Sequence, residues 1–352
     1  MSEYQYGIFI GRFQPVHDGH LAVFNQALSE SKSLIVLIGS ARATQDTKNP
    51  FSYEERTEMI SLALGAKKDG NKAITPSGQT VWFVPIRDYF YNENMWITEV
   101  QYPISKITND DHSVALYGSY KDSSSYYINL FPQWDFRPTK MSSTLSSINA
   151  TDIRNSLFSG IEEQAIKNVP EVVAKWIKEN LTGERLQTLK DEYDFIVNYK
   201  NGWTTPYPVT FVTTDAVVIK SGHVLVIKRK FAPGKGLLAL PGGFLKYNKP
   251  IEDSMMAELK EETRIKVAVP ELRRAIIGSR VFDYPSRDPR GRTITHAFHI
   301  DLGSGELPEV KGGDDAKKAQ WIPLIEALQN ENQFYSDHWH IIYHFMQDRR
   351  FR

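Results

Sequence analysis

Apolar positions in the first half of the chain follow two alternating periods. Short apolar runs have the length of buried strands, at residues 6–11, 33–40, 81–86 and 113–118. A helical pattern follows the first run over about residues 19–31, and a second helix is predicted to open at Ser52, because Ser52 and Glu55 form a capping box. This strand–helix–strand order predicts a parallel sheet that binds ligands at the carboxyl ends of its strands.

The pattern changes between residues 183 and 208. Helical spacing of apolar residues runs as far as Ile196, and the stretch "NGWTTPYPV" then breaks the helix with a glycine and two prolines. Strand-like runs follow at residues 210–219, 223–230, 274–282 and 293–302, with helices predicted at 251–263 and at the end of the sequence. We therefore predict an α/β protein with a domain at 1–183, a helical linker at 184–206 and a mixed-sheet α+β domain at 207–352.

Composition and charge narrow the function classes. Forty-two basic residues balance forty-two acidic ones, so no net field favours nucleic acid or a membrane surface, and neither is expected as a partner. The absence of cysteine excludes disulfides and thiolate catalysis. No targeting segment or bilayer-length apolar run is present, which predicts a cytoplasmic enzyme. Whether the chain forms a homo-oligomer is left open.

The stretch "GRFQPVHDGH" at residues 11–20 carries two histidines three positions apart. His17 and His20 would suit a metal only with further ligands, whereas a phosphate needs only a flexible loop and the amides at the start of a helix. Structural hydrogen bonding by two loop histidines is the third interpretation. Neither Gly-x-Gly-x-x-Gly nor a P-loop sequence occurs, so any nucleotide is held by other means.

This stretch resembles the His-x-Gly-His signature of the nucleotidyltransferase superfamily, a Rossmann-like fold that transfers adenylyl groups from ATP. "NATDIR" at residues 149–154 is similar to the superfamily's late Ser/Thr-x-x-Arg element. The resemblance implies that His17, His20 and Arg154 contact the ATP phosphates and the departing pyrophosphate. It also implies a substrate-binding set formed by Gly11, Arg12, Phe13, Arg56 and Thr151. Within this set, Arg12 and Arg56 are expected to bind the mononucleotide phosphate.

The segment at residues 87–100 bears on the second substrate. Adenylyltransferases that act on nicotinamide mononucleotide (NMN) stack a tryptophan on the nicotinamide ring, and Trp96 with Asn94 occupies a similar place. Burial of Trp96 in the core is the alternative. Nicotinate mononucleotide and a phosphopantetheine-like acceptor also stay open.

A glutamate cluster marks the second half. Glu258, Glu261 and Glu262 fall at i, i+3 and i+4, so their carboxylates share one helical face. Oxygen ligands of this kind suit Mg²⁺ or Mn²⁺. A solvated acidic face is the alternative, although it leaves the preceding Gly-Gly turn unexplained.

The region around this helix resembles the Nudix box, with matches at Gly243, Glu258, Leu259, Glu261, Glu262 and Ile265. The resemblance implies that the three glutamates bind metal and that Glu262 is catalytic. Lys249, Ala257 and Arg264 depart from the family pattern. We expect Lys249 to replace the missing arginine in part, as a cationic partner of the carboxylates.

Two further segments fit a Nudix domain. Residues 312–324 resemble the segment that closes many such domains. The loop at residues 279–293 supplies Arg287, Arg290 and Arg292 beside Phe282 and Tyr284, a set suited to a diphosphate and an adenine. We expect Arg287 and Arg292 to bind substrate, with an exposed basic loop as the alternative.

The two signatures in this order resemble the bifunctional family that joins an NMN adenylyltransferase to a Nudix ADP-ribose pyrophosphatase. That resemblance implies NAD synthesis from ATP and NMN, and cleavage of ADP-ribose to AMP and ribose 5-phosphate. It also implies Mg²⁺ as cofactor, with Mn²⁺ as an option at the Nudix site. The rival hypothesis makes the second half a sensor that binds ADP-ribose or NAD without cleaving it.

Overall fold

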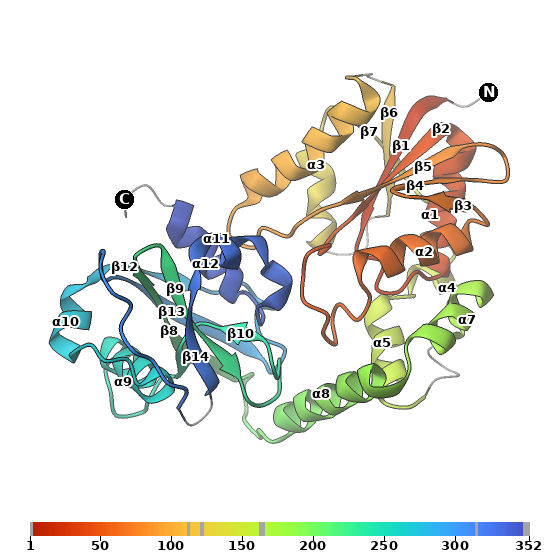
Figure 1. The fold of residues 1–352 in the computed structure, drawn as a ribbon. Helices are drawn as coiled ribbons and strands as arrows, with labels where there is room; N and C mark the ends of the chain where they lie inside the picture. Colours follow the sequence, from red (N-terminus) through yellow and green to blue (C-terminus); the bar gives the residue numbers. More distant parts are fainter. Residues whose placement is uncertain (1–2, 111–112, 120–122, 162–165, 314–315, 348–352) are drawn as a thin grey trace. The chain divides into compact units, whose positions relative to one another are not determined.

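A computed structural model describes residues 3–110, 113–119, 123–161, 166–313 and 316–347 (Figure 1). The chain forms two compact units, residues 1–193 and 194–352. Helix α8 (Gly183–Asn201) begins in the first unit and ends in the second. The division lies inside the segment that the sequence predicts to be a helical linker. Within the described residues, every helix is too short or too polar to cross a bilayer.

The first unit is built on a mostly parallel sheet with the strand order β3-β4-β5-β2-β1-β6-β7. Strands β5, β2, β1, β6 and β7 run parallel to their neighbours, and the short β3 and β4 pair antiparallel at one edge. Its elements are β1 (Tyr4–Gly11), α1 (Asp18–Glu30), β2 (Ser31–Ile38), α2 (Tyr53–Ala63), β3 (Lys67–Asp69), β4 (Lys72–Ile74), β5 (Thr80–Pro85), α3 (Glu93–Thr108), β6 (Val114–Gly118), the 3₁₀ helix η1 (Ser123–Leu130), β7 (Asp135–Pro138), α4 (Ser143–Ser146), α5 (Ala150–Phe158) and α7 (Glu171–Asn180).

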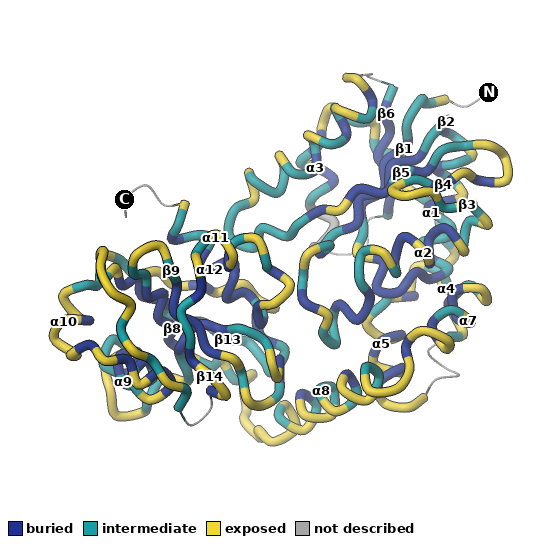
Figure 2. Tube along the Cα trace, viewed as in Figure 1, coloured by how far each residue is buried: buried dark blue, intermediate teal, exposed yellow. Residues whose placement is uncertain are grey.

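Helices cover both faces of this sheet, because successive residues of a strand point to opposite sides. Ile8 and Ile10 of β1 belong to the cluster that contains Ile104 of α3. Phe9, between them, belongs to the cluster that contains Phe24 of α1. Figure 2 shows the strands as the buried centre of the unit. The carboxyl ends of the parallel strands therefore open between the two helical layers, where the predicted ligand loops lie.

The second unit contains a mixed sheet with the path β10-β9-β8-β13-β12, to which β11 adds beside β8 and β14 beside β9. β8 and β13 pair in parallel over ten residues, and the other pairs are antiparallel. Its elements are β8 (Thr210–Lys220), β9 (His223–Arg229), β10 (Leu238–Ala239), β11 (Gly242–Phe244), α9 (Ile251–Thr263), α10 (Val269–Arg274), β12 (Ile276–Phe282), β13 (Arg292–Asp301), β14 (Ala316–Pro323), α11 (Leu324–Gln329), η2 (Glu331–Gln333) and α12 (His338–Gln347).

Two helices lie on opposite faces of the mixed sheet. Phe298 of β13 packs in the cluster that contains Leu259 of α9, whereas the next residue, His299, contacts Phe345 of α12. One face of α9 is thereby buried, and the glutamates at its carboxyl half lie beside β11. The parallel and mixed sheets expected from the sequence are both confirmed.

Candidate functional sites

The two histidines of the first unit lie at the start of α1, directly after the loop that leaves β1. His17 is the N-cap residue of the helix, and its backbone amide donates to Nδ1 of His20 at 3.3 Å. The two rings stack with centroids 3.6 Å apart, and the His20 ring also packs edge-on against Phe13. Because Nδ1 of His20 accepts a hydrogen bond, the neutral ring carries its proton on Nε2. The helix terminus therefore presents fixed imidazoles beside its amides, which is an arrangement suited to an anion.

Arg56 of α2 shapes the loops at this end of the sheet. Its guanidinium donates to the backbone carbonyls of Arg12 at 2.8 Å, Gly39 at 2.7 Å and Ser40 at 3.2 Å, and its Nε donates to that of Ser52. Only 1% of Arg56 is exposed, and burial lowers its pKa to about 10. The observed role is to tie the β1 and β2 loops together, and the phosphate contact expected for Arg56 stays a prediction.

Arg154 of α5 is held in a similar way. It donates to the carbonyl of Gln14 at 2.6 Å, to that of Thr47 at 3.2 Å and to the hydroxyl of Thr151 at 3.2 Å. Burial, and then the nearby charge of Arg12, lower the pKa of Arg154 to about 10. Thr151 thus accepts a hydrogen bond from the arginine three positions later, which explains the spacing of that pair.

Three guanidinium groups consequently share one small region. The charge of Arg12 contributes to lowering the pKa values of both Arg56 and Arg154, after burial in each case. Arg12 is itself exposed and is the arginine of the three that reaches solvent. Mutual repulsion of this kind is relieved by an anion, so the region attracts phosphate.

Two residues of the predicted substrate set have a structural role instead. The ring of Phe13 is 1% exposed and packs against Phe9 and Phe24, so it supports the core and cannot line the surface of the site. Gly11 ends β1, and a side chain there would meet the Phe13 ring at 2.8 Å. The side chain of Phe13 is thus a core residue in this structure, and a substrate contact of Phe13 stays a prediction. The backbone of Gly11 does lie at the loop.

Within residues 87–100, helix α3 begins at Glu93, and it lies on the other helical layer from α1. Trp96 is half-buried and packs on Phe131, with ring centroids 5.8 Å apart, and on Tyr127 at 6.3 Å. Asn94 is exposed. The packing partners of Trp96 match the core interpretation. Trp96 also lies in the first turn of α3, the helix that follows β5, and so it stays near the carboxyl edge of the sheet. Stacking on a pyridine ring stays a prediction.

In the second unit, Glu258 and Glu261 share one cationic partner. Nζ of Lys246 lies 3.1 Å from Oε1 of Glu258 and 2.7 Å from Oε2 of Glu261. Lys249, which the sequence led us to expect in this role, is exposed on the turn that follows. The expectation for Lys249 is wrong because the loop after β11 directs the residue three positions earlier over the helix.

Glu262 faces a different environment from its two neighbours. It is 8% exposed, and its Oε2 accepts the backbone amide of Gly242 at 2.9 Å. Burial raises its pKa to about 8, against the effect of that amide, and the charges of Glu258 and Asp215 raise it further. A carboxyl with a pKa in this range is suited to exchange a proton near neutral pH.

The donor set fits a divalent cation. Carboxylate oxygens are the preferred ligands of Mg²⁺ and Mn²⁺. A side chain at Gly243 would meet Oε2 of Glu258 at 2.8 Å, so this glycine leaves the space that the carboxylate occupies. In the described part of the chain, no three acidic or histidine side chains converge into a ready metal cage. The ligands are therefore near one another but not yet assembled.

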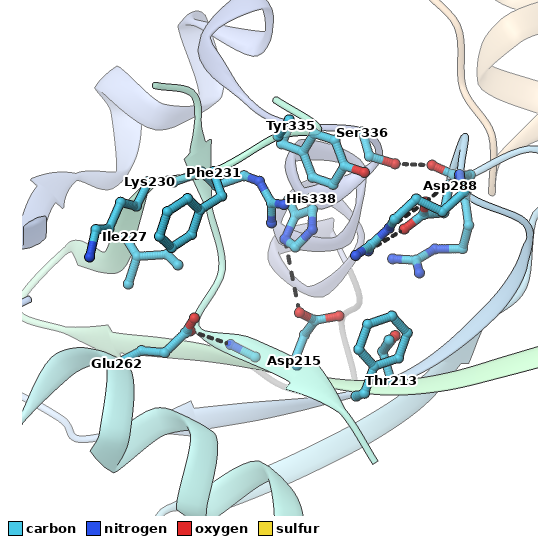
Figure 3. Close-up of a pocket in the computed structure, with 17 residues that line it drawn as sticks. Thr213, Asp215, Ile227, Lys230, Phe231, Glu262, Asp288, Tyr335, Ser336 and His338 are labelled. Carbon is cyan, nitrogen blue, oxygen red and sulfur yellow. Dashed lines mark hydrogen bonds and ion pairs between the residues drawn. The ribbon is translucent and has the colours of Figure 1, made fainter. Parts of the chain in front are cut away.

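A cavity of about 210 Å³ lies next to Glu262 (Figure 3). Figure 3 shows Glu262 and Asp215 along one side and Phe231 and Tyr335 along the other. Besides these, the lining includes cationic and aromatic side chains that sequence reasoning missed, namely Arg229, Lys230, Phe244 and His338. The basic–aromatic stretch "KRKF" at the end of β9, and a phenylalanine inside the Nudix box, were the available signals. Nothing in the local sequence marks Tyr335 or His338.

The basic loop at residues 279–293 divides its arginines among different tasks. Arg287 lines the cavity but forms a buried bidentate ion pair with Asp337, at 2.8 Å for both bonds. Arg292 lies outside the cavity lining and donates to the carbonyl of Asp283 at 2.5 Å. The structure brings Arg287 to the cavity with a charged partner within the protein and leaves Arg292 outside its lining, and the substrate contacts of both stay predictions. Phe282 is fully buried and is no adenine platform.

Arg290 is the arginine of this loop that combines charge with an aromatic surface. It pairs with Asp288 at 2.7 Å, and its guanidinium carbon lies 5.0 Å from the ring centroid of Phe244. Both residues line the cavity. Arg290 belongs to the set of arginines expected from the sequence, whereas the ring beside it is Phe244 of β11 and not Phe282 or Tyr284.

Comparison with known proteins agrees with this division. A "Cytidylyltransferase-like" family model matches residues 8–154, and a "NUDIX domain" model matches residues 210–345. The nicotinamide/nicotinic acid mononucleotide adenylyltransferase of Acinetobacter baylyi is 34% identical over 194 residues, which are 55% of this chain and 95% of the relative. The ADP-ribose pyrophosphatase of Methanocaldococcus jannaschii is 38% identical over 136 residues, 39% of this chain and 73% of the relative.

A solved structure also matches both units together. It is a bifunctional NMN adenylyltransferase/ADP-ribose pyrophosphatase from Francisella tularensis, complexed with AMP and a manganese ion, with 35% identity and a TM-score of 0.87 over 98% of this chain and 99% of the other. Fold and sites thus define a nucleotidyltransferase domain followed by a Nudix domain. The chain belongs to the family of bifunctional NMN adenylyltransferase/ADP-ribose pyrophosphatases.

Proposed function

We propose that the chain synthesises NAD from ATP and NMN in its first unit and hydrolyses ADP-ribose to AMP and ribose 5-phosphate in its second. One observation carries the proposal: each unit places the charges that its reaction needs at one end of its sheet. The first gathers imidazoles and guanidiniums around a helix terminus, and the second gathers carboxylates beside a cavity. Charged nucleotides do not cross membranes, so we also propose a cytoplasmic location for the enzyme.

For adenylyl transfer, a phosphate oxygen of NMN attacks the α-phosphorus of ATP while the bond to the pyrophosphate oxygen breaks. The nucleophile is already an anion, so no general base is needed, and catalysis consists of positioning and charge stabilisation. We assign the imidazoles of His17 and His20 to the ATP phosphates and Arg154 to the departing pyrophosphate. Arg12, the exposed arginine of the region, is placed to receive the NMN phosphate.

For hydrolysis, we assign Glu258, Glu261 and Glu262 as the ligands of Mg²⁺, with Mn²⁺ as an alternative ion. The ion would neutralise charge on the diphosphate and make a bound water more acidic. Glu262 is the carboxyl of the three that lies beside the cavity, and with the ion bound its carboxylate would be ionised and able to accept a proton from the attacking water. Attack of water on one phosphorus then breaks the P–O–P bond and releases the two monophosphates.

We propose that ADP-ribose lies in the cavity beside Glu262. Arg229, Lys230 and Arg290 supply positive charge for the diphosphate, and the exposed rings of Phe231 and Phe244 offer stacking surfaces for adenine. Adenine is therefore assigned to Phe231, which follows β9, and to Phe244 of β11, instead of to the rings of residues 279–293.

Product analysis tests the proposal. The protein is incubated with ATP plus NMN, with ATP plus nicotinate mononucleotide, and separately with ADP-ribose, each with Mg²⁺ and with Mn²⁺. We expect NAD and pyrophosphate in the first reaction, and AMP with ribose 5-phosphate in the last. Tight binding of ADP-ribose without cleavage under either ion would replace the hydrolase by a sensor. A preference for nicotinate mononucleotide would change the acceptor and leave the reaction class intact.

A further inference from the structure

Lys246 lies between the glycine pair of β11 and the start of α9, in the loop that lies over the glutamate face. Its backbone amide donates to the hydroxyl of Ser254 at 3.0 Å, and Ser254 is fully buried in α9. Its carbonyl accepts the amide of Lys249 at 3.1 Å, which closes a turn. The Cα of Lys246 is therefore fixed relative to the helix, and the side chain is directed by this anchorage.

The ammonium group bridges two carboxylates that the proposed hydrolytic site needs for metal. Its distances are 3.1 Å to Glu258 and 2.7 Å to Glu261. A lysine ammonium carries three donors and no acceptor, so it can hold both carboxylates at once. The side chain of Glu258 is only 17% exposed, which limits how much water screens its pair with the lysine.

We propose that Lys246 is an internal counter-ion that competes with the divalent metal for Glu258 and Glu261 and thereby sets the metal affinity of the hydrolytic site. The inference rests on the proposed function of the second unit. A metal ion bound to these oxygens would lie within a few ångströms of the ammonium, and two cations so close repel strongly. Lys246 must therefore leave the carboxylates when the ion enters.

The side chain of Lys246 has room to move away from the two carboxylates. Lys246 is 28% exposed, and its four-carbon chain rotates freely about the anchored backbone. Leaving the carboxylates frees the ammonium to pair with an anion, such as the diphosphate of the substrate. Lys246 is thus a positioning residue: it holds Glu258 and Glu261 before the metal ion arrives and releases them afterwards.

Direct metal binding tests the inference. Mn²⁺ binding to the nucleotide-free, full-length protein is measured by titration calorimetry and by the electron paramagnetic resonance signal of free Mn²⁺. We expect Lys246→Met to bind Mn²⁺ about tenfold more tightly, since a hydrogen-bonded cation no longer has to be displaced. Lys246→Arg, which keeps the charge, should bind as weakly as the parent. Lys249→Met, three positions along the same loop and exposed, is the matched control and should also equal the parent.

Each other outcome is decisive. Lys246→Met could instead bind Mn²⁺ as weakly as the parent or more weakly, while Lys249→Met is unchanged and both variants keep their helix content. That result would overturn the inference that Lys246 competes with the metal ion, and Lys246 would then have a structural role only. A parent protein that binds no Mn²⁺ at all, with or without AMP, would overturn both this inference and the hydrolase. The same shift in Lys249→Met would show a general effect of loop charge and would also overturn it.

Discussion

The two units are proposed to act on similar chemical groups, since both handle a phosphoanhydride, yet they are built with opposite charge. Around the first histidine pair the buried groups are cations, and backbone carbonyls satisfy them. Around the second site the buried group is a carboxyl whose pKa is raised to about 8, and the neighbouring carboxylates depend on Lys246. The cationic groups of the first site can bind phosphate directly. The carboxylates of the second site need a cation between themselves and the substrate.

The comparison teaches that preorganisation differs between the two sites. Arg56 and Arg154 are fixed by bonds to the chain that hold whether or not a ligand is present. The glutamates do not converge in the described structure, so the proposed binding of a metal ion requires them to rearrange. We therefore expect changes in the first site to act through loop shape, and changes in the second to act through ion binding.

The largest expected effect separates the two activities. His20→Asn should lower NAD synthesis by about 10²-fold, because the ring that stabilises phosphate charge is lost while the asparagine side-chain oxygen can still accept the backbone amide of the N-cap residue His17. Glu262→Gln should lower ADP-ribose cleavage by at least about 10²-fold through loss of a ligand and proton acceptor. Both reactions are measured on both variants. Each variant serves as the other's control, and a variant that impairs both reactions would contradict independent sites.

The second effect contrasts two arginines of one region. Arg56→Ala should destabilise the first unit by roughly 3 kcal/mol, because four buried hydrogen bonds to a charged group are lost. Arg12→Ala should change stability by no more than about 0.5 kcal/mol, since its side chain is exposed, but should raise the Michaelis constant for NMN. Urea unfolding and steady-state kinetics decide. Equal destabilisation by both changes would refute the loop-holding role of Arg56.

The third effect sharpens the substrate assignment in the first unit. Trp96→Ala should raise the Michaelis constant for NMN and not for ATP, by an amount equivalent to ~1–3 kcal/mol for a lost stacking contact. Trp134→Ala is a matched control, because Trp134 stacks on the same Phe131 at 4.7 Å and is outside the predicted site. If both variants unfold alike and leave both Michaelis constants unchanged, Trp96 is a core residue only.

The last effect, which is small over any single pH unit, concerns the second unit without metal. The pKa of Glu262 is raised from 4.5 to about 8, so between these values the folded protein holds a proton that the unfolded chain has lost. Stability conferred by the neutral carboxyl is therefore present below pH 4.5 and lost as pH rises towards 8, at up to about 1 kcal/mol per pH unit. Glu262→Gln should remove that slope. Hydrogen exchange of α9 amides in metal-free protein measures it, and an unchanged slope would show that Glu262 is ionised at neutral pH.

Much of the architecture followed from apolar periodicity. The capping box at Ser52 and Glu55 is present, and α9 spans the predicted residues 251–263. Periodicity did not reveal the short strands β3, β4, β10 and β11, because two or three residues carry no period. Helix α3 was also not predicted, since its apolar residues are interrupted by Pro103 and polar positions.

The candidate sites were predictable only where a local motif fixes the geometry. His17 and His20 lie together because their spacing places both on the first turn of one helix. The different roles of the arginines were not predictable, because each role depends on a partner distant in sequence. Arg287 pairs with Asp337, and Arg56 donates to the backbone carbonyl of Arg12. Lys246 was missed for a similar reason, since its direction is set by the bond of its amide to the helix.

The bonds of the buried arginines also have a kinetic consequence for how the first site is completed. The contact from Arg56 spans 44 positions to Arg12, and that from Arg154 spans 140 positions to Gln14. Contacts of such long sequence separation close late, after the sheet and its helices have condensed. The loop after β1 should therefore acquire its shape on the native side of the folding barrier. Substitutions at Arg154 should accordingly give φ-values near zero, hastening unfolding while leaving the folding rate almost unchanged.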